Sequence, residues 1–127
     1  MEKTLEKIIP FSVIDMKEEA YFGQVGVILF TETLKSNLKN CGIMKNQSDN
    51  IMVPQKDKFG HYSFSIPVEG DCLRKKLEII LNKSGLIKFE ILFYNLSDGK
   101  WKSVEVRGFM PMNEFNKRFP DIIESLN

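Results

Sequence analysis

The chain has 127 residues, the length of one ordinary domain, and 43% of them are hydrophobic, so it can bury a substantial core. Its formal net charge of +1 excludes strong global attraction to polyanions, and a nucleic-acid role would need local clusters of charge. The first residues, MEKTLEKII, contain no apolar run long enough for export or membrane insertion, so we expect a cytoplasmic protein without membrane contact.

The two cysteines, Cys41 and Cys72, match no metal-ligand spacing. We expect both to be small core residues in a reducing compartment. No metal and no cofactor is expected.

The first part of the chain is expected to form β-strands. Phe11–Ile14 follows Pro10 as a short apolar run, and Tyr21–Phe30 is rich in β-branched and aromatic residues. Gly23 and Gly26 inside the second run indicate a bulge or a close approach of the backbone.

The segment Leu34–Met44 fits two structures. Leu34 and Leu38 have helical spacing with Cys41, but the same leucines also lie on one face of a strand. The asparagines and Gly42 weaken the helical interpretation.

The middle of the chain predicts a hairpin. Lys45–Asn50 and Gln55–Gly60 have the composition of turns around a very short strand, Ile51–Val53. His61–Val68 then alternates, and we expect its apolar side chains to face the core: Tyr62, Phe64, Ile66 and Val68.

Cys72–Lys83 is the strongest helix prediction. Asp71 can cap its start and Gly85 can end it in the left-handed conformation. The expected buried stripe consists of Leu73, Leu77, Ile80 and Leu81.

A second hairpin is predicted from Ile87–Tyr94 and Trp101–Phe109, around the turn signal Asp98-Gly99. Pro111–Asn127 predicts one or two short helices broken at Pro120. The expected fold class is therefore α+β: a small, mostly antiparallel β-sheet followed by a helix, with an added C-terminal hairpin and short terminal helices, all within a single domain of residues 1–127.

Catalysis finds little support in the sequence. There is no nucleophile-elbow motif and no glycine-rich phosphate loop. His61 is the only histidine, and a metal site needs three or four converging ligands. A solvent-facing histidine on a strand is its ordinary interpretation, and we expect no enzyme.

Positive charge gathers in residues 33–76, which hold eight basic residues against four acids. The basic residues are Lys35, Lys39, Lys45, Lys56, Lys58, Arg74, Lys75 and Lys76. They could form a patch that contacts phosphates without reading bases, or they could solvate turns. Convergence of Lys56, Lys58, Arg74 and Lys75 on one face would favour the first interpretation, and dispersal would favour a protein partner.

Aromatic residues could also provide a surface on which the bases of a single strand stack. Tyr62 and Phe64 fall on the expected core face, and Tyr94 and Trp101 could equally pack under the terminal helices.

The order of features in CGIMKNQSDNIMVPQKDKFGHYSFSIPV, followed by CLRKKLEIILNK, resembles the SpoVG-like family of small bacterial proteins. The likeness covers about residues 9–83. It implies a compact sheet followed by a helix, a strand over Leu34–Met44, dimerisation and nucleic-acid binding by a regulator. Gln55 replaces the usual serine, Ser63 and Phe64 replace a charged pair, and residues 86–127 have no counterpart.

The sequence thus predicts a small cytoplasmic regulator that binds DNA or RNA and forms a homodimer by pairing exposed strand edges. The candidate binding residues are Lys56, Lys58, His61, Arg74, Lys75 and Lys76. The last three would be helped by the positive end of the predicted helix. The alternative is an adaptor or immunity-type protein that binds a protein partner through its C-terminal part.

Overall fold

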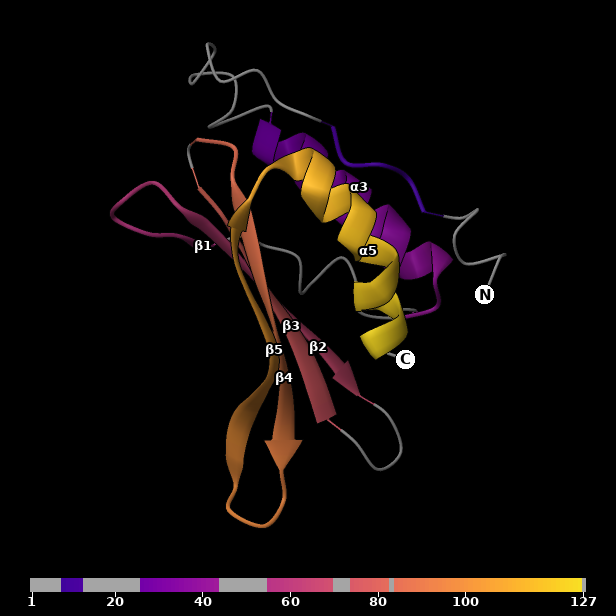
Figure 1. Ribbon diagram of the computed structural model, residues 1–127, viewed down its shortest axis with the longest axis vertical. Coiled ribbons are helices and arrows are strands. Elements are labelled where there is room, and N and C mark those ends of the chain that lie inside the picture. The colour runs from indigo at the N-terminus through magenta and orange to yellow at the C-terminus, as the bar shows by residue number, and fades with distance from the viewer. Residues whose placement is uncertain (1–7, 13–25, 44–54, 70–73, 83, 127) are drawn as a thin grey trace.

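The computed structural model describes residues 8–12, 26–43, 55–69, 74–82 and 84–126. They form an antiparallel five-stranded sheet in the order β1-β2-β3-β4-β5, with two helices side by side on one of its faces (Figure 1). This arrangement confirms the α+β fold class. The elements are α3 (Val27–Asn40), β1 (Gln55–Lys56), β2 (Tyr62–Glu69), β3 (Arg74–Leu81), β4 (Ile87–Asn95), β5 (Lys100–Met110) and α5 (Met112–Leu126).

The strand predictions for residues 61–68 and for the second hairpin are confirmed. In β2, Phe64 and Ile66 are buried, and Tyr62 and Val68 pack against the core. β4 and β5 pair around Gly99, whose φ of 67° is the left-handed conformation that a tight turn requires.

The helix predicted over Cys72–Lys83 is wrong, because residues 74–81 form strand β3 between β2 and β4. Leu77, Ile79 and Leu81 are buried at every second position, whereas Ile80 lies half-buried on the other face. A central strand satisfies its backbone groups on both sides, and the alternating pattern then places three apolar side chains in the core. Gly85 belongs to the β3–β4 connection.

The strand predicted over residues 21–30 is also wrong where the structure describes it, and so is the strand that the family likeness implies for residues 34–44, where the helical alternative is confirmed up to Asn40. Gly26 has helical φ and ψ of −62° and −41°, and α3 continues to Asn40. Its apolar face recurs at helical spacing and meets the sheet: Val27, Phe30, Leu34 and Leu38. After Asn40 the N–H of Ile43 donates to the carbonyl of Leu38, and that of Gly42 to Lys39, which is a Schellman ending with glycine at φ 74°.

At the C-terminus there is one continuous helix, and Pro120 lies inside it without breaking it. The helix loses one backbone hydrogen bond there, but the packing of Phe119, Ile122 and Ile123 in the core compensates for it.

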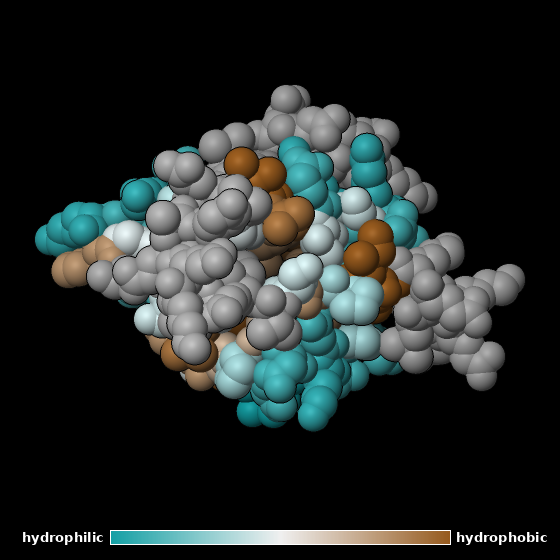
Figure 2. Space-filling view, turned by 90° about the horizontal axis from the view of Figure 1, so that it is seen from above, coloured by the Kyte–Doolittle hydropathy of each residue, from teal (hydrophilic) through white to brown (hydrophobic). Residues whose placement is uncertain are grey.

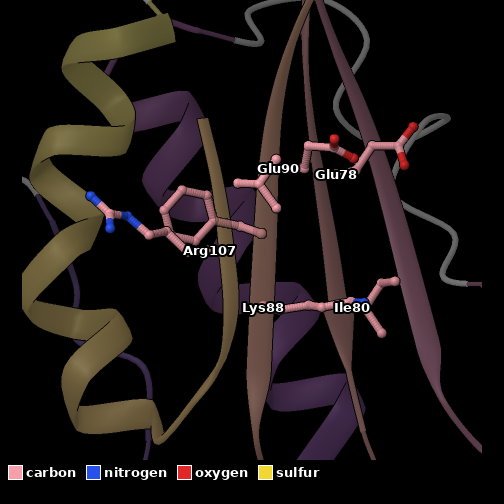
Figure 3. A pocket seen from close by; sticks show the side chains of 7 residues that line it. Glu78, Ile80, Lys88, Glu90 and Arg107 are labelled. Carbon is pink, nitrogen blue, oxygen red and sulfur yellow. The ribbon is translucent and has the colours of Figure 1, made fainter. Parts of the chain in front are cut away.

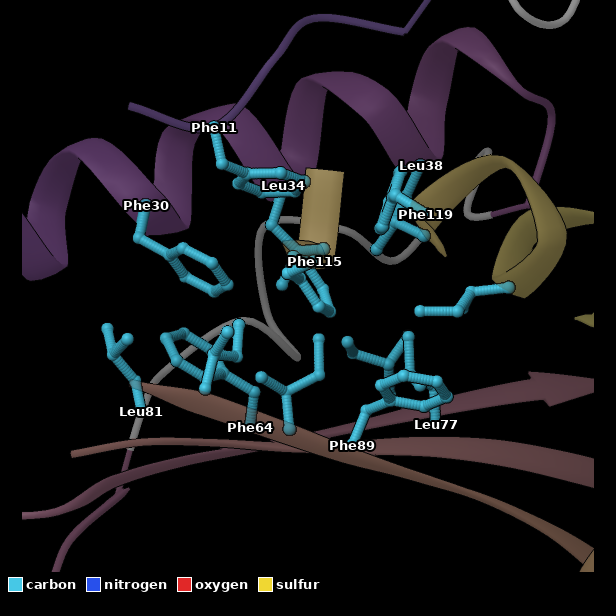
Figure 4. Close-up of a cluster of buried hydrophobic side chains, with 14 of the residues drawn as sticks. Phe11, Phe30, Leu34, Leu38, Phe64, Leu77, Leu81, Phe89, Phe115 and Phe119 are labelled. Atoms are coloured by element: carbon cyan, nitrogen blue, oxygen red, sulfur yellow. The ribbon is translucent and has the colours of Figure 1, made fainter. Parts of the chain in front are cut away.

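The core lies between the sheet and the two helices (Figure 4). Its centre is aromatic, with Phe30 from α3, Phe64 from β2 and Phe115 and Phe119 from α5. Phe11 also reaches this cluster, from an extended segment; Phe11 and Ser12 form no strand. Cys41 packs against the core as expected.

Several predictions lie outside the described residues: the segments 13–25, 44–54 and 70–73, which include Cys72. Gln55 and Lys56, expected in a turn, pair with Ser63 and Tyr62 as β1.

Candidate nucleic-acid interface

The sheet has a second face, directed away from α3 and α5, which we call the outer face. Its side chains alternate along the strands with those that enter the core. It consists of Ser63 and Ser65 of β2, Arg74, Lys76, Glu78 and Ile80 of β3, Lys88, Glu90, Leu92 and Tyr94 of β4, and Trp101, Ser103, Val106 and Phe109 of β5.

At the end of the outer face near the β4–β5 turn, two aromatic rings lie next to two cations. The rings of Tyr94 and Trp101 meet edge to face, with centroids 5.3 Å apart. The Nζ of Lys76 lies 4.6 Å from the centroid of Trp101, and the guanidinium carbon of Arg74 lies 5.9 Å from that of Tyr94. Trp101 remains 37% exposed, so a planar ligand can reach it.

A second cluster lies at the opposite end of the sheet. The His61 ring is 6.3 Å from that of Phe59 and 6.1 Å from that of Phe109, while the Nζ of Lys88 is 5.0 Å from the Phe109 centroid. Phe109 is 41% exposed. Together these residues place basic and aromatic groups side by side.

The turn before β2 is held by Asp57. Its carboxylate accepts hydrogen bonds from the backbone N–H of His61, at 2.9 Å, and of Phe59, at 2.8 Å. The hydrogen bond from the His61 backbone is the main reason that the pKa of Asp57 is lowered, and the Phe59 backbone adds to it. These hydrogen bonds hold the turn in one conformation and thereby fix the position of the His61 backbone.

Two glutamates separate these clusters. Glu78 and Glu90 are direct cross-strand partners at the centre of the outer face. Glu78 pairs with Lys76 at 3.2 Å, and Glu90 accepts a hydrogen bond from the Ser103 hydroxyl. The two glutamates line a shallow pocket with Lys88 (Figure 3). Both carboxylates are negative and repel a phosphate group. The centre of this face therefore disfavours contact with the nucleic-acid backbone.

Arg107 also borders this pocket, but it does not belong to the outer face. It is the cross-strand partner of buried Phe89, and its side chain points toward α5 (Figure 3). It is therefore not counted among the cations of the outer face.

The six residues predicted from the sequence do not form one patch, and by the criterion given above this dispersal favours a protein partner over the phosphate-binding patch predicted from the sequence. Tyr62, which pairs with Lys56, and Glu69, which pairs with Arg74, are seven residues apart on β2, or about 23 Å. Lys58 and His61 belong to the turn before β2, near the Lys56 end. The predicted help from a helix N-terminus is absent, because residues 74–76 begin a strand.

Neighbouring residues of this set also lie on opposite faces. Lys76 lies on the outer face, whereas the Nζ of Lys75 donates to the backbone carbonyl of Ser125 in α5, at 2.9 Å. Lys56 stands over Tyr62, at 5.6 Å, on the helix side of the sheet. Arg74, Lys76 and His61 reach the outer-face clusters, and the Nζ of Lys58 lies 5.3 Å from the Phe59 ring of the second cluster.

Sequence reasoning missed Lys88 and Phe109 and left Tyr94 and Trp101 undecided. The alternation in IKFEILFYN predicts that Lys88, Glu90 and Tyr94 share one face opposite to the buried residues. The sequence therefore indicated one half of the outer face. The other half, on β3, could not be predicted, because β3 was interpreted as a helix.

The described part of the chain has no group of three potential metal ligands, and none of its helices has the length and hydropathy that a bilayer-spanning helix needs.

The end of the molecule that is uppermost in Figure 1 shows mostly hydrophilic described atoms with small separate hydrophobic patches (Figure 2).

Comparison of the chain with protein-family models, with curated proteins and with solved structures finds no match. The likeness to the SpoVG-like family therefore stays a prediction.

Proposed function

We propose that this protein is a non-enzymatic regulator that binds single-stranded nucleic acid on the outer face of its sheet. The observation that supports this most directly is that three rings on this face, Tyr94, Trp101 and Phe109, each have a cation beside them. Sheets that bind single strands use the same two elements, rings for stacking and cations for phosphates.

Stacking a base on Trp101 displaces the Lys76 ammonium from the ring. A cation–ring contact at an exposed site contributes about 0.5–1 kcal/mol, whereas one stacked base contributes about 1–3 kcal/mol. The exchange is favourable, and the released ammonium is then free to contact the phosphate next to the stacked base.

The charges on this face favour modest, salt-sensitive binding. Lys76, Lys88 and Arg74 face the glutamate pair Glu78 and Glu90, so the outer face has only a small net positive charge. Three phosphate contacts would give a slope of about −2 in a plot of log K against log salt, at roughly −0.7 per contact for single strands.

Fluorescence anisotropy with labelled single-stranded DNA and RNA of about ten nucleotides tests this proposal, with the duplex of the same sequence as a second ligand. We expect the single strands to bind more tightly at low salt. Lys76→Ala should reduce the salt slope by about 0.7. Lys102→Ala is the matched control, because Lys102 pairs with Phe93 on the helix side of the sheet. Absence of binding at low salt, or equal effects of the two substitutions, contradicts the proposal.

A protein partner is the second candidate function, and exposed valines on β5 support it. Val104 and Val106 are 67% and 61% exposed, and they belong to β5, which is an edge strand of the sheet. A pull-down that recovers one stoichiometric protein, lost in a Val106→Asp variant and free of nucleic acid, would favour this candidate.

The expected homodimer would need a strand edge that can pair. β5 has two register irregularities against β4, and in both β5 contains the extra residue. Bulges and basic residues on an edge strand hinder pairing with another chain. Pairing through β5 is therefore a poor route to a dimer. Sedimentation of the chain across a concentration series, with Val106→Asp as the comparison, tests it.

A further inference from the structure

Residues Ile8–Ser12, which we call the strap, lie in a groove between α3 and α5. Two asparagine side chains hold the strap by its backbone. The N–H of Ile9 donates to Oδ1 of Asn37 at 2.6 Å, and Nδ2 of Asn37 donates to the Ile9 carbonyl at 2.9 Å. Asn116 makes the same pair of bonds with Phe11, at 2.7 and 2.8 Å.

These four bonds imitate the way a β-strand pairs with an added peptide. Residues two apart each have both backbone groups satisfied, as in the recognition of an extended peptide. Pro10, between them, has no N–H that needs a partner, and its fixed φ favours an extended chain.

One side chain anchors the strap in the core. Phe11 is 2% exposed, and its ring lies 4.9 Å from Phe30, 5.0 Å from Phe119 and 5.3 Å from Phe115 (Figure 4). The groove thus recognises an extended backbone and one aromatic ring, and the half-buried Ile8 side chain also packs against the core.

The groove needs an occupant. Asn37 is completely buried, and a buried amide that loses its hydrogen-bond partners is costly. The two asparagines that bind the strap, which we call the clamps, are distant from it in sequence. Ile9 and Asn37 are 28 residues apart, and Phe11 and Asn116 are 105 residues apart. A second copy of the chain offers the same peptide to the same clamps.

We propose that the groove between α3 and α5 accepts the strap of a second copy, so that two chains exchange straps in a dimer. Residues 13–25 join the strap to α3, and a chain of that length can span up to roughly 45 Å. Exchange of an identical element is a low-cost route to a dimer. This inference does not depend on nucleic-acid binding.

The tether sets the concentration at which exchange begins. A segment joined by a short connection competes at an effective concentration on the order of 1 mM. The monomer therefore dominates at micromolar concentration, and strap exchange increases as the protein approaches 1 mM or as seating within the same chain is weakened.

The first experiment uses two full-length variants with different tags. Phe11→Ala keeps the groove but loses the anchor, and Asn116→Ala keeps the strap but loses the clamp at Phe11. Each alone should be monomeric by light scattering at about 0.1 mM, below the effective concentration of the tether. An equimolar mixture should form a dimer containing both tags, because one intact strap then meets one intact groove.

A second experiment uses wild-type protein, so that strap exchange is tested even if one of the variants folds poorly. Two tagged wild-type populations are mixed and incubated at about 1 mM, chemically cross-linked at that concentration, and co-purification of the tags is then measured. Mixed-tag dimers that disappear when both populations contain Phe11→Ala support strap exchange. Absence of mixed-tag dimers in the wild type overturns it, and so do dimers that persist unchanged with Phe11→Ala.

Discussion

Replacement of Trp101 by alanine separates a stacking role from a structural one. Trp101 contacts Tyr94 and Lys76 on the outer face and stays partly exposed. The aromatic pair contributes about 0.5–1.5 kcal/mol and the cation about 0.5–1 kcal/mol, so the variant should lose about 1–2.5 kcal/mol of folding free energy. Typical domains have about 5–15 kcal/mol, and the variant should remain folded.

The expected loss in binding does not follow from the loss of stability, because a variant that stays folded keeps almost all of its molecules competent to bind. Removal of one stacking ring costs about 1–3 kcal/mol in affinity, which is roughly a 5- to 150-fold rise in Kd for a single strand. Anisotropy titrations measure Kd, and circular dichroism at the same temperature confirms folding. Leu96→Ala is the control, because Leu96 is an exposed apolar residue in the adjacent turn. A folded Trp101→Ala protein whose Kd equals that of the Leu96→Ala control would refute the stacking argument.

Three further predictions concern stability. Ile79→Asn should destabilise the protein by several kcal/mol, because it buries an amide in the core. Ile80→Asn, on the outer face, should cost about 1 kcal/mol or less. Urea unfolding that shows the reverse order of stability would favour a helix over residues 72–83. Phe11→Ala should lower the free energy of unfolding by about 3–5 kcal/mol, and a urea midpoint equal to that of the wild type would show that the strap is not seated. The side-chain hydrogen bond from Lys102 lowers the pKa of Asp98 below its ordinary value of 3.8, so its contribution to the hairpin is present above that pH and lost as the pH falls through the lowered value. An NMR titration of the Asp98 carboxyl checks this, and a midpoint above 3.8 would contradict it.

The hairpins were predictable because their signals are local. Alternation over residues 61–68 and the Asp98-Gly99 turn need only neighbouring residues to be interpreted. For α3 a local signal was also present but was misread. Gly42 was counted against a helix, yet it occupies the position just after the helix end, where glycine is preferred.

The segment RKKLEIIL shows where local reasoning stops. Leu77, Ile80 and Leu81 fit a helix, and Leu77, Ile79 and Leu81 fit a strand equally well. Pairing with β2 on one side and β4 on the other decides between them, and those partners are distant in sequence. Because the error placed Ile80 and Lys76 on a helix, whereas they lie on the outer face of the sheet, it also hid the candidate site.

The candidate site depends on contacts that no spacing rule contains. Lys76 meets Trp101 because β3, β4 and β5 are adjacent, and consecutive lysines at 75 and 76 diverge because strand side chains alternate. A run of positive charge in a sequence therefore predicts a patch only after the secondary structure is known. On a helix, Lys75 and Lys76 could both have faced one phosphate backbone, but on β3 one of them tethers α5 and only the other can reach a ligand.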